Sequence, residues 1–108
     1  MNIKKEVVGI LQTNCYILEK NNEVLVIDPG DDFAKIDKHL INKKVVGIIL
    51  THNHSDHTGA VKDIVNKYYS PIYDNANLSE GINKIGSFQF EVISTKGHTN
   101  NSITIYFK

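Results

Sequence analysis

Three of the five histidines lie within six consecutive positions of the chain, and an aspartate lies between them. They are His52, His54 and His57, with Asp56 directly before the last of them. Imidazole and carboxylate groups are the ligands that zinc and iron take in proteins, and a catalytic metal site keeps one position open for water. A cluster this dense is rare at this composition, so we interpret it as a metal site rather than a polar loop whose histidines cap a helix.

The histidine cluster follows a predicted buried strand, the aliphatic run at residues 45–50. His52 and His54 are two residues apart, so in extended backbone they project to the same side. Asp56 and His57 come where the chain turns into a helix, so they could face a second metal ion. In open α/β sheets, ligands bind beyond the carboxyl ends of the strands. The spacing therefore predicts one or two metal ions at the end of this strand.

Three other residues with reactive side chains lie outside the cluster. His98 lies in a turn between two predicted strands, where it could fold back onto the pair His52 and His54; taken alone, it is a surface histidine. We expect His39 to face solvent from a predicted helix. Cys15 is expected to be a small buried side chain, with a redox or metal role as the less favoured alternative.

Strands alternate with helices in the first part of the chain, and strands alone follow. We predict extended structure over 7–28, with a hairpin turn at residues 21–22 and a buried strand over 24–27. The remaining predicted elements are a helix over 33–42 capped by Asp31 or Asp32, a helix over 57–68, a short strand over 71–73, an irregular segment over 74–85, and strands over 88–92 and 103–107. This order is typical of an α/β or mixed layered domain.

Composition restricts the possible partners. The 108 residues fit one domain, and twelve basic against twelve acidic residues give a formal net charge of zero. That balance argues against nucleic-acid binding and against a polybasic membrane anchor. We find no run long enough to span a bilayer and no signal peptide, and one cysteine cannot form an internal disulfide. We therefore expect a cytoplasmic protein that acts on a small molecule.

The motifs together resemble a known family. The run His-x-His-x-Asp-His at 52–57 follows a strand, Asp28-Pro29-Gly30 precedes it and Gly97-His98-Thr99 comes after it. Residues 12–16 (QTNCY) and 49–51 (ILT) match as well. This pattern resembles the metallo-β-lactamase-fold hydrolases, and most of all their glyoxalase II-like, or hydroxyacylglutathione hydrolase-like, branch. The resemblance extends from about residue 3 to residue 107.

The resemblance implies a set of metal ligands. His52, His54 and His98 would bind the first ion, and Asp56 and His57 the second. Asp28 would support the ligand loop without touching metal, because such outer partners fix the orientation and tautomer of ligating histidines. The alternative for Asp28 is a turn residue before proline. The ions would be zinc, one or two per chain, with iron or manganese as further possibilities.

The resemblance also implies a fold and an activity. The fold would be α/β, the N-terminal half of a metallo-β-lactamase-like αββα sandwich, with a mixed sheet that carries its helices on one face. The function would be metal-dependent hydrolysis of a thioester or a related ester or amide bond, with Asp56 as the catalytic residue that orients or deprotonates the attacking water. Two alternatives stay open: a non-catalytic metal-binding half-domain or fragment that needs a partner, and an iron-dependent sulfur dioxygenase.

The chain departs from the family pattern after His98. Family members supply an aspartate that bridges both ions and a last histidine for the second ion, whereas residues 99–108 contain no acid and no histidine. We therefore expect a domain over 1–108 that is truncated after the third ligand motif and weakly active or inactive alone. Without a second sheet, the apolar faces of the strands over 88–92 and 103–107 would be uncovered. This predicts a homodimer, or a complex with a separate second half of the domain.

Overall fold

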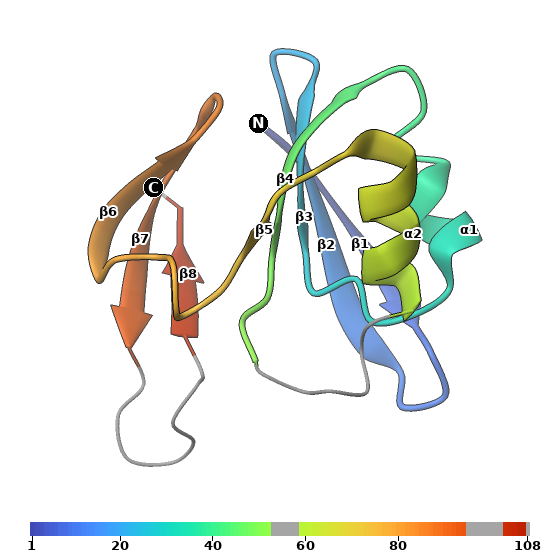
Figure 1. Ribbon diagram of the computed structural model, residues 1–108, viewed down its shortest axis with the longest axis horizontal. Helices are drawn as coiled ribbons and strands as arrows, with labels where there is room; N and C mark the ends of the chain where they lie inside the picture. The colour runs from blue at the N-terminus through green and yellow to red at the C-terminus, as the bar shows by residue number, and fades with distance from the viewer. Residues whose placement is uncertain (53–58, 95–102, 108) are drawn as a thin grey trace.

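Two β-sheets face each other, and two helices cover the outer side of the larger sheet (Figure 1). The computed structural model describes residues 1–52, 59–94 and 103–107. The elements in chain order are β1 (Asn2–Val8), β2 (Thr13–Lys20), β3 (Glu23–Ile27), α1 (Phe33–Asp37), β4 (Lys44–Ile49), α2 (Gly59–Tyr68), β5 (Ile72–Tyr73), β6 (Gly81–Ile85), β7 (Phe88–Ser94) and β8 (Ile103–Tyr106). Neither helix in these ranges is long and apolar enough to cross a membrane.

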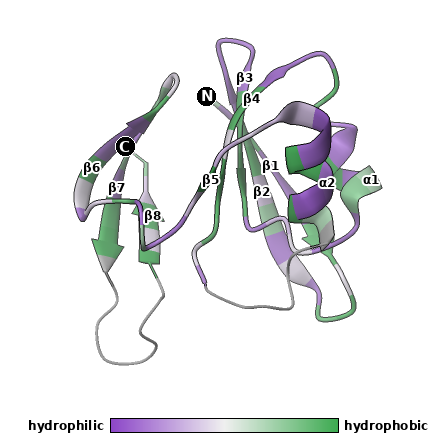
Figure 2. Cartoon of the chain, in the orientation of Figure 1, coloured by the Kyte–Doolittle hydropathy of each residue, from purple (hydrophilic) through white to green (hydrophobic). Residues whose placement is uncertain are grey.

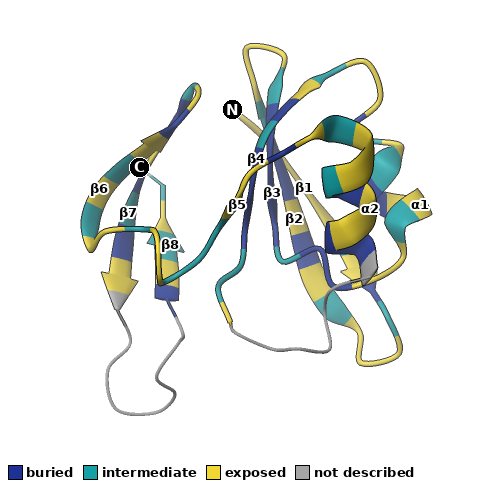
Figure 3. Ribbon diagram, in the orientation of Figure 1, coloured by how far each residue is buried: buried dark blue, intermediate teal, exposed yellow. Residues whose placement is uncertain are grey.

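The larger sheet is mixed, in the order β1-β2-β3-β4-β5. Its first three strands are antiparallel, whereas β3, β4 and β5 run parallel to one another. The predicted hairpin turn between β2 and β3 is confirmed, because Asn21 and Asn22 both adopt positive φ angles of 55° and 63°. β3 is aliphatic at consecutive positions because both of its faces are covered, and it lies in the buried centre of the molecule (Figure 3).

The helices bury one face of the larger sheet. α2 alternates hydrophobic and hydrophilic stretches around its axis (Figure 2), and its Val61 and Ile64 are 6% and 0% exposed. From the first helical segment, Ile36 and Leu40 are fully buried against the same layer. Each such side chain contributes about 1.5–3 kcal/mol through its burial. The sheet and helices of the predicted α/β fold are confirmed.

A second sheet, in the order β6-β7-β8, covers much of the other face. The expectation that this face lacks a covering sheet was wrong. Apolar residues of the small sheet that we expected to be uncovered are only 1–6% exposed; they are Phe88, Phe90, Val92 and Ile103. The segment over 74–85 is not wholly irregular either, because β6 forms there by pairing with β7. Ile105 and Phe107 are half-buried.

The start of α1 holds the turn between β1 and β2, residues 9–12. Asp32 occupies the N-cap position, but its carboxylate makes no capping bond and instead accepts the Gly9 N–H at 2.8 Å. Asp32 therefore holds the predicted cap position, but the prediction that its side chain caps the helix was wrong. The α-helix also ends earlier than predicted, at Asp37, and tighter turns follow, such as the bond from the His39 N–H to the Ile36 carbonyl.

His39 does not face solvent as predicted. Its side chain is 16% exposed, and its Nε2 lies 3.6 Å from Oε1 of Glu6 on β1. His39 therefore lies at the contact between the turns that follow α1 and the edge strand β1.

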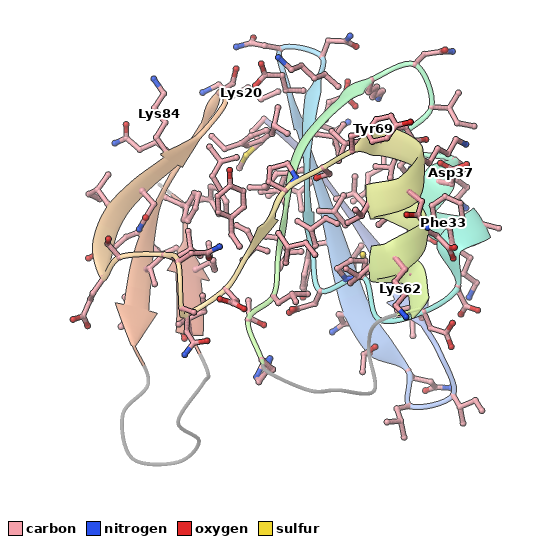
Figure 4. The ribbon with its side chains drawn as sticks, viewed as in Figure 1. Lys20, Phe33, Asp37, Lys62, Tyr69 and Lys84 are labelled. Atoms are coloured by element: carbon pink, nitrogen blue, oxygen red, sulfur yellow. The ribbon has the colours of Figure 1, made fainter. Side chains whose placement is uncertain are left out.

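Asp37 at the end of α1 joins the two helices (Figure 4). Its Oδ2 accepts a hydrogen bond from Lys67 Nζ at 2.6 Å, and its Oδ1 accepts one from the Tyr68 hydroxyl. Burial alone would raise the pKa of the Asp37 carboxyl, but the hydrogen bonds from Lys67 and Tyr68, together with the lysine charge, lower it. The ionised carboxylate therefore stabilises the fold.

Replacing Asp37 with asparagine is expected to lower the free energy of unfolding at pH 7 by about 1–2 kcal/mol, since two hydrogen bonds to a charged acceptor weaken. The folded-state pKa lies below the unfolded one, so this contribution is present above the unfolded-state pKa and is lost as the pH falls through the folded-state pKa. Urea unfolding at pH 7 and near pH 3 measures it. The exposed Asp63 on α2, replaced in the same way, is the control. An equal loss at both pH values would contradict this account.

Candidate metal centre

His52 lies just beyond the carboxyl end of β4, at an exposed position. Asp28 lies at the equivalent point after β3, and its N–H bonds the Ile49 carbonyl at 2.9 Å. Because β3 and β4 are parallel neighbours, their carboxyl ends meet at one edge of the sheet. Two of the predicted site residues therefore lie at the same edge, where α/β sheets commonly bind ligands.

Thr51 links the two residues. Its N–H donates to Asp28 Oδ1 at 2.8 Å, its hydroxyl donates to Asp28 Oδ2, and its Oγ1 lies 2.9 Å from Nδ1 of His52. A hydroxyl has one proton, so an Oγ1 that donates to Asp28 must accept from the His52 Nδ1–H. This tautomer places the ring's lone pair on Nε2, one of the two ring nitrogens through which an imidazole binds a metal.

The two residues that flank the segment 95–102, in which His98 lies, are beside the same edge. Ile103, at the start of β8, donates its N–H to the Thr51 carbonyl at 3.0 Å, and Ser94, at the end of β7, pairs with Ile103. The residues that flank 95–102 thus lie beside Thr51, which directly precedes the 52–57 run, although more than 40 positions separate them in the sequence.

The other predicted ligands, His54, Asp56, His57 and His98, lie outside the described residues, and their roles stay predictions. Within the described ranges, three or more histidine, cysteine, aspartate or glutamate side chains do not gather at any point. The donor set nonetheless fits a zinc or iron ion: it offers imidazoles and a carboxylate, and His52 has the appropriate tautomer. The predicted supporting role of Asp28 also stays a prediction, which its contacts with Thr51 favour.

A cleft of about 990 Å³ opens beside these residues. Asp28, Thr51 and His52 line it at the sheet edge, and Leu11 from the β1–β2 turn lines it as well. The sequence interpretation assigned no role to Thr51 or Leu11. For Thr51, the available signal was its position between a buried strand and a histidine. Nothing in the sequence singled out Leu11.

Cys15 on β2 lies close to the site but is fully buried. Burial raises the pKa of its thiol to about 12, and the negative charges of Asp28 and Glu6 add to the effect. The side chain therefore stays a protonated thiol in the core on the helix side of the sheet, in agreement with its interpretation as a small buried residue.

Comparison with known proteins yields consistent matches. The sequence profile of the metallo-beta-lactamase superfamily matches residues 8–80. The chain is 29% identical to the probable metallo-hydrolase YqgX of Bacillus subtilis (strain 168), over all of this chain and 66% of that protein. It is 33% identical to the hydroxyacylglutathione hydrolase of Buchnera aphidicola subsp. Baizongia pistaciae (strain Bp), over 83% of this chain and 41% of that protein.

Solved structures show the same fold. The crystal structure of the B3 metallo-beta-lactamase BLEG-1 superposes with a TM-score of 0.84 at 26% identity, over 98% of this chain and 67% of that one. TTHA1623, whose crystal structure is of a di-iron-bound form, superposes with a TM-score of 0.77 at 27% identity, over 96% of this chain and 66% of that one.

The chain is shorter than these relatives. It spans 66% of YqgX and 41% of the Buchnera enzyme. The alignment with YqgX also covers 140 positions, more than the 108 residues of this chain, so YqgX carries residues between the matched segments that this chain lacks.

Proposed function

Because the chain belongs to the metallo-beta-lactamase superfamily, we propose that it is a metal-dependent hydrolase of a thioester or a related ester or amide bond. The observation that carries the proposal is the hydrogen-bonded series from Asp28 through Thr51 to His52, at the edge of the cleft. It holds one histidine of the motif in a single tautomer, with the lone pair on Nε2, as groups that support a metal ligand commonly do.

The proposed ligands follow the sequence interpretation. His52, His54 and His98 hold the first ion, and Asp56 and His57 hold the second. Bound zinc, iron or manganese supplies a Lewis acid that lowers the pKa of water and polarises the carbonyl of the substrate. Asp56 orients or deprotonates the attacking water. Hydrolysis of a thioester joins the oxygen of water to the acyl carbon, breaks the carbon–sulfur bond, and yields a carboxylic acid and a thiol.

A partner is also part of the proposal: a second copy of this chain, or a separate second half of the domain. We place the protein in the cytoplasm, where a single buried cysteine remains reduced. A non-catalytic metal-binding half-domain is the second candidate.

The experiment is a hydrolysis assay on the purified chain loaded with zinc or with iron, with simple acyl thioesters and thiol release as the readout. We expect slow turnover. Asp56→Asn should abolish this turnover without removing the first ion, because the proposal assigns Asp56 to the attacking water and to the second ion. Sizing the same sample by light scattering identifies the active species. Metal binding without turnover in both monomer and dimer would favour the half-domain over the hydrolase.

A further inference from the structure

The cleft beside His52 is predominantly apolar. Its lining residues come from β1, β2, β5, β8, α2, the β1–β2 turn and the ends of β3 and β4. Among its described lining residues, Asp28 is the one carboxylate, and there is no lysine or arginine. Most of the other lining residues are apolar, among them Ile3, Leu11, Ile103, Ile105 and Phe107.

The cleft extends away from the candidate metal centre along β8. Ile103 lies at the metal end, because its N–H bonds the Thr51 carbonyl, and Phe107 lies four residues further along. Four residues of extended chain span about 13 Å. On the opposite wall, Ile3 of β1 and Tyr16 of β2 are 55% and 37% exposed, so this wall presents apolar surface to the opening.

Leu11 lies in the β1–β2 turn with 76% of its surface exposed. The turn is held in place: the Gln12 N–H bonds the Gly9 carbonyl at 3.1 Å, and Asp32 accepts the Gly9 N–H. Lys35 Nζ also donates to the Val7 carbonyl at 3.1 Å. A leucine that a braced turn holds at the wall of a cleft is positioned to contact a bound molecule, and exposed apolar surface of this kind often marks a binding site.

Resting on the proposed function, we infer that this cleft binds the hydrocarbon part of the substrate, a medium-chain acyl group whose carbonyl lies at the metal end. An acyl chain gains affinity with each methylene that the apolar walls bury. A hydroxyacyl-glutathione substrate carries two carboxylates on its peptide, and burying an anion in the described part of the cleft without a cationic partner is unfavourable. The substrate class is therefore a medium-chain acyl thioester or ester.

The test is a binding measurement on the metal-free chain, so that it does not depend on turnover. The probes are ketone analogues of butanoyl- and decanoyl-N-acetylcysteamine, in which a methylene replaces the thioester sulfur, and titration calorimetry gives the dissociation constants. We expect the decanoyl analogue to bind at least about tenfold tighter than the butanoyl one, because burial of each methylene raises affinity about fourfold, so burial of two of its six additional methylenes is enough.

A matched pair of variants locates the binding. Leu11→Gln is expected to weaken decanoyl binding severalfold, whereas Ile10→Gln leaves it unchanged, because Ile10 is in the same turn, is 97% exposed and is not among the lining residues. Both side chains are exposed, so neither change should affect folding; thermal unfolding checks this.

The outcomes separate this inference from the proposed hydrolase. Chain-length-dependent binding that Leu11→Gln weakens supports the cleft assignment even if no thioester is hydrolysed. Equal affinity for both analogues overturns it, and so does tighter binding of an S-alkylglutathione, even if thioesters are hydrolysed. If the decanoyl analogue does not bind and Leu11→Gln instead changes the mass in solution, the cleft is an interface between protein chains and the inference is wrong.

Discussion

Replacing His54 with alanine is expected to reduce bound zinc or iron from about one ion per chain to almost none, because two histidines alone rarely hold a catalytic metal. The purified chain is loaded with the metal, passed over a desalting column and analysed by elemental mass spectrometry. His52→Ala should have the same effect, since Thr51 holds the ring of His52 in the tautomer that binds metal.

The control for this experiment is His39→Ala. His39 is half-buried beside Glu6 of β1, in the turns that follow α1, and it is not among the residues that line the cleft beside His52. Its loss should leave the metal content unchanged. If His54→Ala keeps its metal, or if His39→Ala loses it, the assignment of the first ion to His52, His54 and His98 is wrong.

Replacing Asp28 with asparagine is expected to weaken metal affinity by about 10–100-fold, the usual effect of losing a group that supports a ligand. Asparagine tolerates the left-handed φ of 55° at this position, so the backbone need not move. Its Oδ1 can still accept the Thr51 N–H, but its NH₂ group cannot accept the Thr51 hydroxyl proton. Without that acceptor, the Thr51 hydroxyl can donate its proton to His52 Nδ1 instead of accepting the Nδ1–H. It then no longer fixes the tautomer of His52.

Two further variants distinguish this positioning role from a general loss of stability. Thr51→Val should weaken metal binding about as much as Asp28→Asn, whereas Thr51→Ser should retain it because the hydroxyl remains. Asp31→Asn is the matched control, since the Asp31 carboxylate accepts the Asp32 N–H instead. Competition with a metallochromic chelator gives the affinities. Equal affinity for Thr51→Val and the unmodified chain would contradict the role of the hydroxyl.

Local patterns predicted the elements that the structure contains where one pattern dominated. The aliphatic runs of β3 and β4 required cover on both faces, and Ile36 and Leu40 shared a helix face. β6 was missed because its alternation is weak: Ile82 is 60% exposed, and the strand forms through pairing with β7. Alternation in β7 identified which residues share a face, but not the second sheet that this face belongs to.

Contacts between distant segments limited the prediction of the site. Asp32 was expected to cap its own helix, but its carboxylate binds the Gly9 N–H, 23 positions away. Likewise, neither charge nor spacing indicates that Thr51 contacts Asp28, or that Ile103 meets Thr51. The importance of Asp28 came from the family resemblance. The histidine motif predicts a site at the end of β4, which stays a prediction, and it gave no indication of the cleft beside His52.

The hydrogen bond from Ile103 to Thr51 also couples ligand binding to folding, because it joins an edge strand of the small sheet to the end of β4 in the large one. A molecule that contacts both sheets binds only while they are together. By mass action it stabilises the folded chain, by about 2.7 kcal/mol when its free concentration is a hundred times its dissociation constant. The melting temperature of the chain should therefore rise with the logarithm of ligand concentration, which makes thermal shift a direct screen for its natural ligand.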